Sequence, residues 1–147
     1  MIDLFYTIKM RYLIDTNILI RLFNDHDAIS KDIWNIFDDS ENLIHVSAVS
    51  LQEIYLLLQN KKIDAKQWKK PRDVFEYIEN ELFFAIKYVQ KEHLITFADI
   101  VPAEGHNDPS DRMIIAQAIT EQIPLISSDT KFHHYRKQKL DFIFNDK

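Results

Sequence analysis

The sequence predicts a single α/β domain with a central, mostly parallel β-sheet and helices on both of its faces. Short apolar runs, typical of buried parallel strands, alternate along the chain with longer segments of helical spacing. The 147 residues, 46% of them hydrophobic, are enough for one compact core and too few for two ordinary domains. In sheets of this class, ligands bind beyond the carboxyl ends of the strands, so polar residues at those ends are the functional candidates.

The strands are predicted from apolar runs, and the helices from the period of their apolar residues. Strands are expected at residues 12–14, 43–46, 84–87, 124–126 and 141–144. Helices are expected at residues 18–23, 31–38, 48–60, 74–82, 92–100 and 109–122, with a shorter one over 130–136. Ser47 is the expected cap of the third helix, and Pro109 occupies the first helical position of the sixth. The four prolines all lie where the pattern changes, so they separate elements without dividing the chain into domains.

The composition excludes several classes of protein. With one glycine, Gly105, the chain cannot form the glycine-rich loops that bind phosphates through backbone amides. With no cysteine it has no disulfide, thiolate nucleophile or iron–sulfur cluster. A net charge of −5 provides no general attraction for nucleic acid, so any such contact must be local. No apolar run approaches the length of a membrane span, and no signal peptide is recognisable. We therefore expect a cytoplasmic protein with no membrane partner.

Two aspartates follow directly on predicted strands. Asp15 ends the run Tyr12-Leu13-Ile14, and Asp129 follows the strand at 124–126 after two serines. Each carboxylate is expected at the functional edge of the sheet. Each could equally be the N-cap of the helix that follows, because a carboxylate there accepts the free amide hydrogens of the first turn.

A third carboxylate, Glu53, lies in a helix that is apolar on nearly every side. Its neighbours three and four positions away include Val49, Leu56 and Leu57. Burial of an unpartnered carboxylate costs roughly several kcal/mol, so we expect the surroundings of Glu53 to offer a cation, a hydrogen-bond donor or an opening to solvent. A capping box with Ser50 is the structural alternative, which we discount because Ser47 is the expected cap.

The segment from His106 to Arg112 contains two aspartates with different expected roles. Asp108 precedes Pro109 and is predicted to cap the helix. Asp111 then lies in the first turn, where the helix dipole favours an anion. It is also one turn from Ile114 and Ile115, so we expect it to face the sheet rather than solvent. A bound metal ion would explain an inward carboxylate at this position.

Four carboxylates from separate parts of the chain are thus expected to converge, namely Asp15, Glu53, Asp111 and Asp129. Because like charges repel at close range, their convergence implies a divalent cation. Oxygen ligands suit Mg²⁺ or Mn²⁺. The six histidines show no spacing typical of a metal site, and His106 is not assigned a role.

These motifs resemble those of the PIN-domain superfamily, and within it the VapC-like ribonuclease toxins of type II toxin–antitoxin pairs. The resemblance covers residues 10–147 and rests on residues 12–17, 47–53, 106–118 and 125–129. It implies a PIN-like nuclease domain over residues 10–147, preceded by an N-terminal extension of residues 1–9. It matches the four carboxylates to the acidic quartet of the family, with Thr16, Asn17, Ser128 and Asp108 as polar support. Ser110 stands where many relatives carry a phenylalanine, which changes the rim of the pocket and removes no ligand.

The resemblance implies a metal-dependent endoribonuclease that hydrolyses RNA and is inhibited by a cognate antitoxin protein, and we also expect a homodimer. Arg112, Lys61 and Lys62 are candidate contacts to the RNA backbone. The two lysines belong to a basic stretch, residues 61–72, that could equally be a solvated connection between helices.

Two other functions are considered. A haloacid-dehalogenase-like phosphatase also begins with a strand that ends in Asp, but it requires a second acid two residues later, where this chain has Asn17. A non-catalytic binding module could use the acidic pocket to dock a basic peptide. Such a module would neither bind Mn²⁺ tightly nor cleave RNA.

Overall fold

The computed structural model describes residues 8–64 and 66–147. Five strands form one sheet: β1 (Met10–Ile14), β2 (Asn42–Ser47), β3 (Ala85–Lys87), β4 (Leu125–Ser127) and β5 (Phe142–Phe144). The α-helices are α1 (Thr16–Asn24), α2 (Lys31–Asp38), α3 (Ala48–Gln59), α4 (Pro71–Glu76), α5 (Lys91–Asp99) and α6 (Pro109–Glu121). Three other helical segments are η1 (His26–Ala28), η2 (Tyr77–Glu81) and η3 (Thr130–Gln138).

The sheet has the strand order β3-β2-β1-β4-β5, and every pair of neighbouring strands is parallel. The predicted α/β fold is therefore confirmed, and the sheet is parallel throughout the part of the chain that the structure describes. From β1 the chain proceeds through α1 and α2 to β2 on one side, while β4 pairs with β1 on the other side. This reversal of strand order between β1 and β4 is a topological switch point, where α/β proteins bind ligands.

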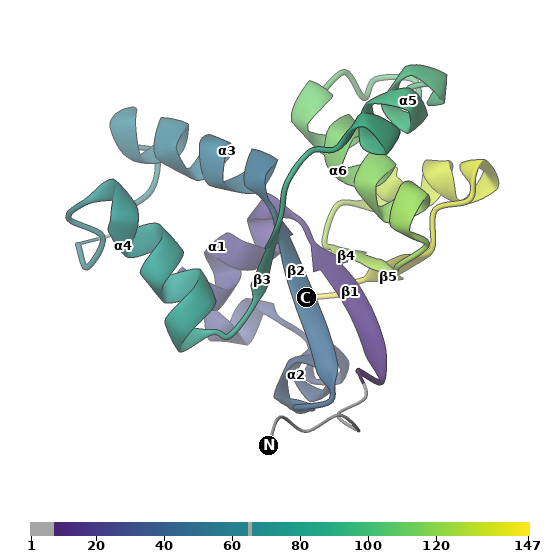
Figure 1. Cartoon of the computed structure of the whole chain (residues 1–147). Helices are drawn as coiled ribbons and strands as arrows, with labels where there is room; N and C mark the ends of the chain where they lie inside the picture. The colour runs from purple at the N-terminus through teal and green to yellow at the C-terminus, as the bar shows by residue number, and fades with distance from the viewer. Residues whose placement is uncertain (1–7, 65) are drawn as a thin grey trace.

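Helices cover both faces of the sheet (Figure 1). Successive residues of each strand point to opposite faces, so Leu13 and Leu125 belong to one core and Ile14 and Ile126 to the other. The core that contains Ile14 packs against α1, α2, α3 and α4, and the core that contains Leu13 packs against α6 and η3. The apolar runs recognised in the sequence are continuous because central strands are buried on both faces.

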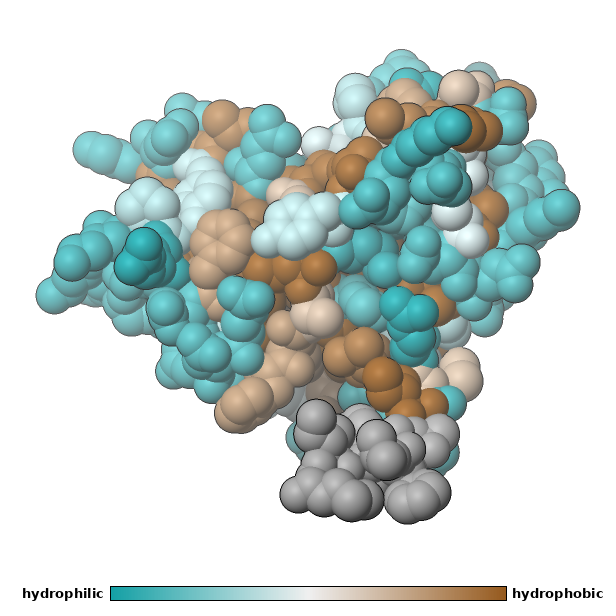
Figure 2. All heavy atoms as spheres, viewed as in Figure 1, coloured by the Kyte–Doolittle hydropathy of each residue, from teal (hydrophilic) through white to brown (hydrophobic). Residues whose placement is uncertain are grey.

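The surface view shows mostly hydrophilic side chains over two lobes, one formed by α3 and α4 and the other by α5 and α6 (Figure 2). Apolar side chains gather along the middle of this face, where β2 and β3 run. Phe83, just before β3, is 78% exposed, and Tyr88, just after it, is 57% exposed. Among the described residues, no helix is both long enough and apolar enough to cross a membrane.

Three elements differ from their predicted form. The helix expected at 74–82 is α-helical only through Glu76 and ends in a π-turn, in which Leu82 N donates to Tyr77 O at 2.9 Å, five residues back. The helix expected at 130–136 is a 3₁₀-helix that extends to Gln138. The 3₁₀ turn at His26–Ala28 was not predicted. Over one or two turns, α-, 3₁₀- and π-helices place apolar residues at similar spacings, so the spacing in the sequence does not distinguish them.

The proposed N-terminal extension is described only from residue 8. Lys9 N donates to Glu41 O at 2.8 Å, and its Nζ lies 3.2 Å from Asp39 Oδ2. Residues 1–7 lie outside the described residues.

Candidate active site

The switch point brings Asp15 and Asp129 to one edge of the sheet. Asp15 follows β1 and Asp129 follows β4, and Asp15 N donates to Ile126 O at 3.2 Å across these neighbouring strands. Both aspartates are also helix caps: Asp15 accepts from Ile18 N, and Asp129 accepts from Lys131 N. The caps predicted as the structural alternative are therefore present, and both carboxylates still lie at this edge of the sheet.

Asp15 is the most buried of the four carboxylates, with 3% of its surface exposed. Its Oδ1 accepts from Ile18 N at 3.0 Å, and its Oδ2 accepts from the hydroxyl of Ser127 at 2.5 Å. Burial, together with the negative charges of Asp111 and Asp129, raises the pKa of Asp15 to about 7 despite these two donors. The two hydrogen bonds thus fix the carboxylate in position, but they do not offset the cost of burying its negative charge.

Glu53 reaches the same edge from α3. Its Oε1 accepts a hydrogen bond from the Thr16 hydroxyl at 2.5 Å, and the oxygen of Ser50 lies 2.9 Å from that of Thr16. Ser47 caps α3 through Val49 N, so the discounted capping box with Ser50 is not the role of Glu53. Partial burial raises the pKa of Glu53, and the charges of Asp108 and Asp111 add to this effect.

The two aspartates at the start of α6 separate as predicted. Asp108 is the N-cap, and its Oδ1 accepts from Ser110 N at 2.9 Å and Asp111 N at 3.2 Å. Asp111 points inward, and burial raises its pKa while the hydrogen bond from His106 lowers it. Asp108 therefore caps the helix, and Asp111 is the residue that faces the other three carboxylates.

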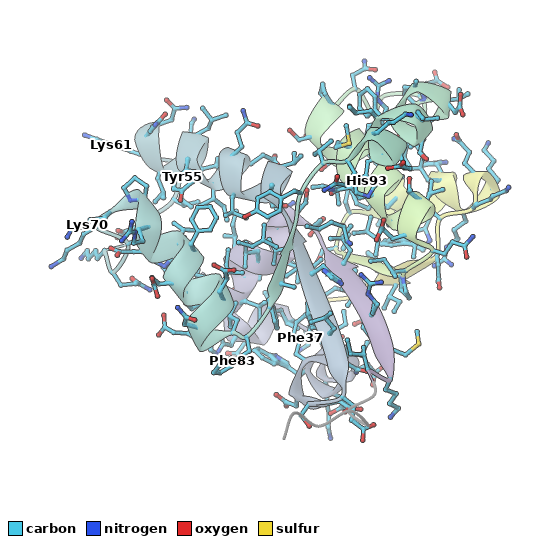
Figure 3. The ribbon with its side chains drawn as sticks, viewed as in Figure 1. Phe37, Tyr55, Lys61, Lys70, Phe83 and His93 are labelled. Carbon is cyan, nitrogen blue, oxygen red and sulfur yellow. The ribbon has the colours of Figure 1, made fainter. Side chains whose placement is uncertain are left out.

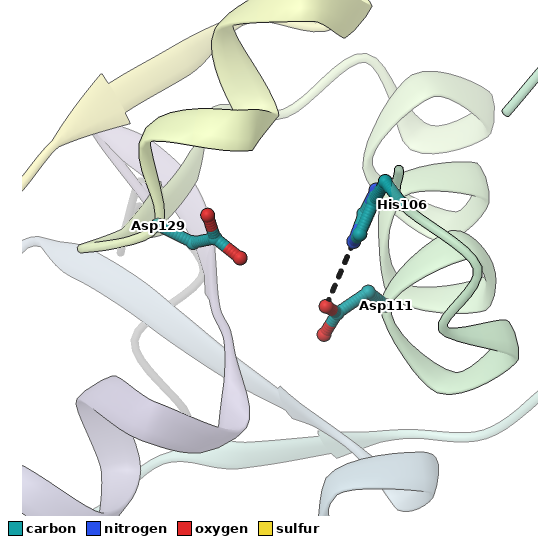
Figure 4. Close-up of side chains that lie close together, drawn as sticks. All are labelled: His106, Asp111 and Asp129. Carbon is teal, nitrogen blue, oxygen red and sulfur yellow. Dashed lines mark hydrogen bonds and ion pairs between the residues drawn. The ribbon is translucent and has the colours of Figure 1, made fainter. Parts of the chain in front are cut away.

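His106 was not assigned from the sequence, yet it is 5% exposed and contacts the cluster directly. Its Nε2 lies 3.0 Å from Asp111 Oδ2, as Figure 4 shows, and its Nδ1 lies 2.7 Å from Tyr135 Oη. The Tyr135 oxygen also accepts from Ala103 N at 3.0 Å, so its own proton is free to go to Nδ1. This assignment leaves Nε2 protonated and makes His106 a donor that orients Asp111.

These side chains surround one pocket of about 400 Å³. All four predicted carboxylates line it, together with Thr16, Asn17 and Asp108 from the predicted supporting set. The other lining residues are Leu57, Gly105, His106, Asn107 and Lys131. Among residues 8–64 and 66–147, Asp15, Glu53 and Asp129 form no ion pair. The pocket thus holds more negative charge than its own side chains neutralise.

The serine beside Asp15 is Ser127, whereas the sequence indicated Ser128. Ser127 donates to Asp15 and its oxygen accepts from Asp129 N at 3.0 Å, so it bridges the two aspartates. Ser128 instead accepts from Arg21 at 2.6 Å and from Asn145 at 2.7 Å. Adjacent residues at a strand end point to opposite sides, so a shift of one position changes which serine reaches the pocket.

The three predicted RNA contacts lie outside the pocket. The Arg112 guanidinium lies over the Phe97 ring at 4.0 Å and lines a small neighbouring hollow. Lys61 and Lys62 follow the C-terminal end of α3, and Figure 3 shows Lys61 at the outer tip of that lobe, pointing away from the sheet. Lys131 was not predicted, but it lines the pocket and its Nζ lies 3.5 Å from Gly105 O.

The donor set of the pocket fits a divalent metal ion. Asp111 and Asp129 each offer a carboxylate oxygen, and these two atoms lie within 4.8 Å of each other and of a His106 ring nitrogen (Figure 4). In the tautomer assigned above, both nitrogens of His106 are engaged, by Asp111 and by Tyr135, so the histidine positions a ligand and is not one itself. Carboxylate oxygens are the ligands preferred by Mg²⁺ and Mn²⁺. A cation would also relieve the burial and mutual repulsion that raise the pKa values of Asp15, Glu53 and Asp111.

The chain belongs to the PIN domain family, because the model of that family matches residues 12–138. The acidic pocket at the switch point lies within this matched region.

Solved structures have the same fold. A chain of VapBC2 from Rickettsia felis, bound to a DNA fragment from its promoter, is similar at 16% identity with a TM-score of 0.66, over 92% of this chain and 98% of that chain. A chain of VapBC-1 from nontypeable Haemophilus influenzae is similar at 17% identity with a TM-score of 0.67, over 94% and 100% of the two chains. A chain of VapBC from Salmonella typhimurium, bound to DNA, is similar at 15% identity with a TM-score of 0.62, over 92% and 98%. The sequence matches no curated protein.

Proposed function

We propose that this PIN-domain protein is a metal-dependent endoribonuclease. The observation that carries the proposal is the convergence of four carboxylates, from the ends of β1 and β4 and from α3 and α6, on one pocket. Within the described part of the chain, three of them form no ion pair. PIN domains are a family of metal-dependent nucleases, and the expectation that the substrate is RNA comes from the resemblance of the sequence motifs. Membership in this family also argues against the phosphatase alternative.

Asp15, Asp111 and Asp129, with Glu53 beside them, would hold one or two Mg²⁺ or Mn²⁺ ions. When bound, such an ion lowers the pKa of a coordinated water and offsets charge on the phosphate and the leaving oxygen. The protein groups keep the ligands in place: Ser127 and Ile18 N fix Asp15, Thr16 fixes Glu53, and His106 orients Asp111. Rigid ligands of this kind reduce the reorganisation required when the metal and substrate bind.

Positively charged groups near the pocket would hold the RNA backbone. Lys131 lines the pocket itself, and Arg112 lines the adjacent hollow with Asp108 and His106. Lys61 and Lys62 would meet only RNA that extends to the outer end of α3. Because these contacts are ionic, binding of RNA is expected to weaken as the salt concentration rises.

The test is cleavage of single-stranded RNA by purified protein. We expect cleavage with Mn²⁺ or Mg²⁺, none with EDTA, and recovery when excess Mn²⁺ is added back, with single-stranded DNA of the same sequence as a parallel substrate. Cleavage that persists in EDTA would overturn the metal dependence. Tight Mn²⁺ binding without cleavage of any RNA would leave a metal-binding module, and neither binding nor cleavage would leave a docking module.

We also propose that the protein is the toxin of a toxin–antitoxin pair and is a homodimer. The solved structures similar in fold include VapBC complexes, and an acidic pocket is complementary to an Arg or Lys side chain. An antitoxin that inserts such a side chain would block metal and substrate together. Co-expression with the adjacent small reading frame, followed by pull-down, is expected to recover a complex in which RNA cleavage is suppressed. If no associated protein is recovered, the toxin–antitoxin role is contradicted, while the nuclease proposal stands.

A further inference from the structure

A second hollow, of about 630 Å³, lies between the loop before α6 and the helix η3. It is lined by Val101, Pro102, Ala103, Glu104, His134, Lys137 and Gln138. It contributes none of the four carboxylates, and its position beside the acidic pocket suggests a role in substrate binding that rests on the proposed function.

The second hollow is connected to the acidic pocket through its lining residues. Pro102 is shared with the small hollow that also contains Arg112, and that hollow shares His106, Asn107 and Asp108 with the acidic pocket. Along the opposite side, η3 has its N-cap Asp129 and its first-turn residue Lys131 in the acidic pocket, and its last residues, Lys137 and Gln138, in the second hollow. From Lys131 to Lys137, a 3₁₀-helix advances roughly 12 Å. The three hollows therefore adjoin one another along this edge, which we call the path away from the carboxylates.

The walls of this path are held by specific hydrogen bonds. The Gln138 side chain accepts from Val101 N at 2.9 Å and donates to Val101 O at 2.8 Å. Buried Tyr135 accepts from Ala103 N and also contacts His106, so the same helix fixes both the second hollow and the acidic pocket. The second hollow is therefore formed before any ligand binds, which reduces the entropic cost of binding.

The charge of this edge is opposite to that of the whole chain. Between Thr130 and Leu140 the sequence has four Lys or Arg residues and no Asp or Glu, although the net charge of the chain is −5. Of these four, Lys131 lines the acidic pocket and Lys137 the second hollow. All four of these residues, and His134, are exposed. Glu104 is the single acidic residue in the lining, and Val101 beside it presents apolar surface, 69% exposed.

We propose that the second hollow binds an unpaired nucleotide of the RNA strand whose phosphodiester bond lies in the acidic pocket. The base lies against Val101, Pro102 and the ring of His134, and its phosphate is near Lys137. Unpaired RNA bases are characteristically recognised by stacking on aromatic side chains, including His, and the phosphates by cations. A hollow that combines apolar surface, an exposed ring and a cation provides both kinds of contact.

The test measures binding of a fluorescently labelled single-stranded RNA in EDTA, where cleavage does not occur, at several salt concentrations. His134→Ala removes the stacking partner and is expected to weaken binding by roughly tenfold without changing the salt dependence. Lys137→Gln removes one phosphate contact and is expected to reduce the slope of log affinity against log salt by about 0.7. A change in this slope would not result from a merely structural role.

Lys139→Gln is the matched control. Lys139 lies two residues further along, carries the same charge and lines a different hollow with Asp141 and Ile119. It is expected to bind RNA as the wild type does. Equal effects of Lys137→Gln and Lys139→Gln, unchanged binding by His134→Ala, or no binding by the wild type would each overturn the proposal.

Cleavage in Mn²⁺ separates this proposal from the proposed function. If the wild type cleaves RNA and both variants do so with an unchanged KM, the nucleotide site is wrong and the nuclease stands. If the variants lose binding as expected but the wild type cleaves no RNA, the nucleotide site stands and the nuclease activity is wrong.

Discussion

Asp111→Asn is expected to abolish RNA cleavage in Mn²⁺ while leaving the metal-free protein as stable as the wild type or more stable. The substitution keeps the shape of the side chain and an oxygen that can accept from His106, but it removes a charge from a pocket with four other carboxylates. Loss of a metal ligand removes several kcal/mol of transition-state stabilisation, so we expect a decrease in kcat/KM of about 10³-fold or more. Burial raises the pKa of Asp111, so its negative charge destabilises the metal-free folded state, and the substitution removes that charge.

Asp108→Ala is the matched control for this prediction, because the two aspartates are three residues apart and have opposite roles. Asp108 accepts two amide hydrogens at the start of α6, so its loss is expected to cost about 1 kcal/mol of stability and to retain much of the activity per folded molecule. Melting temperature in EDTA and cleavage in Mn²⁺ are measured for both variants. Normal cleavage by Asp111→Asn together with reduced stability would mean that Asp111 is only a first-turn charge.

Asp15→Asn is expected to stabilise the metal-free protein, and more so at high pH. The pKa of Asp15 is about 7 in the folded protein and near 3.8 when unfolded, so the folded state binds the proton more tightly between these values. The contribution of Asp15 to the stability of the wild type therefore falls as the pH rises from about 4 to 7, and it is constant above about pH 7. Relative to the wild type, the variant is expected to gain roughly 3 kcal/mol more at pH 8 than at pH 5, because each pKa unit corresponds to about 1.4 kcal/mol.

Comparison of the wild type with Asp15→Asn separates the effect of Asp15 from that of groups whose contribution to stability changes with pH in the opposite direction. Burial lowers the pKa of His45 to about 4, and this group makes the fold more stable as the pH rises between about 4 and 6.5. His45 is present in both proteins and cancels in the difference. Urea unfolding of both proteins at the two pH values, in EDTA, measures the effect. A difference that does not change with pH would show that Asp15 is ionised as readily in the folded chain as in the unfolded one.

The acidic residues could be predicted from the sequence because each follows a recognisable element. Asp15 and Asp129 come after apolar strands, and parallel strands end at the same edge of the sheet. Asp108 and Asp111 were separable because Pro109 fixes the first position of α6. From the sequence, capping and pocket roles are alternatives for Asp15 and Asp129, but in the structure each carboxylate accepts an amide hydrogen and also lines the pocket.

The residues around the carboxylates could not be predicted, because their positions depend on irregular backbone. His106 reaches Asp111 only through the loop at residues 101–108, in which Gly105 has a φ of 75°. Tyr135 meets His106 from a 3₁₀-helix 29 residues later, and no spacing in the sequence encodes that contact. The choice of Ser127 over Ser128 depends on the residue at which β4 ends, which a pattern predicts only to within a residue or two.

Titration calorimetry with Mn²⁺ tests the central claim, that the converged carboxylates are a metal site, most directly. The wild type is expected to bind Mn²⁺ with a saturable signal and to be stabilised by it, whereas Asp15→Asn is expected to show no binding under the same conditions. Asp108→Ala, which leaves the inward carboxylates in place, is expected to retain binding. Equal Mn²⁺ affinity in the wild type and Asp15→Asn would contradict the assignment of the site.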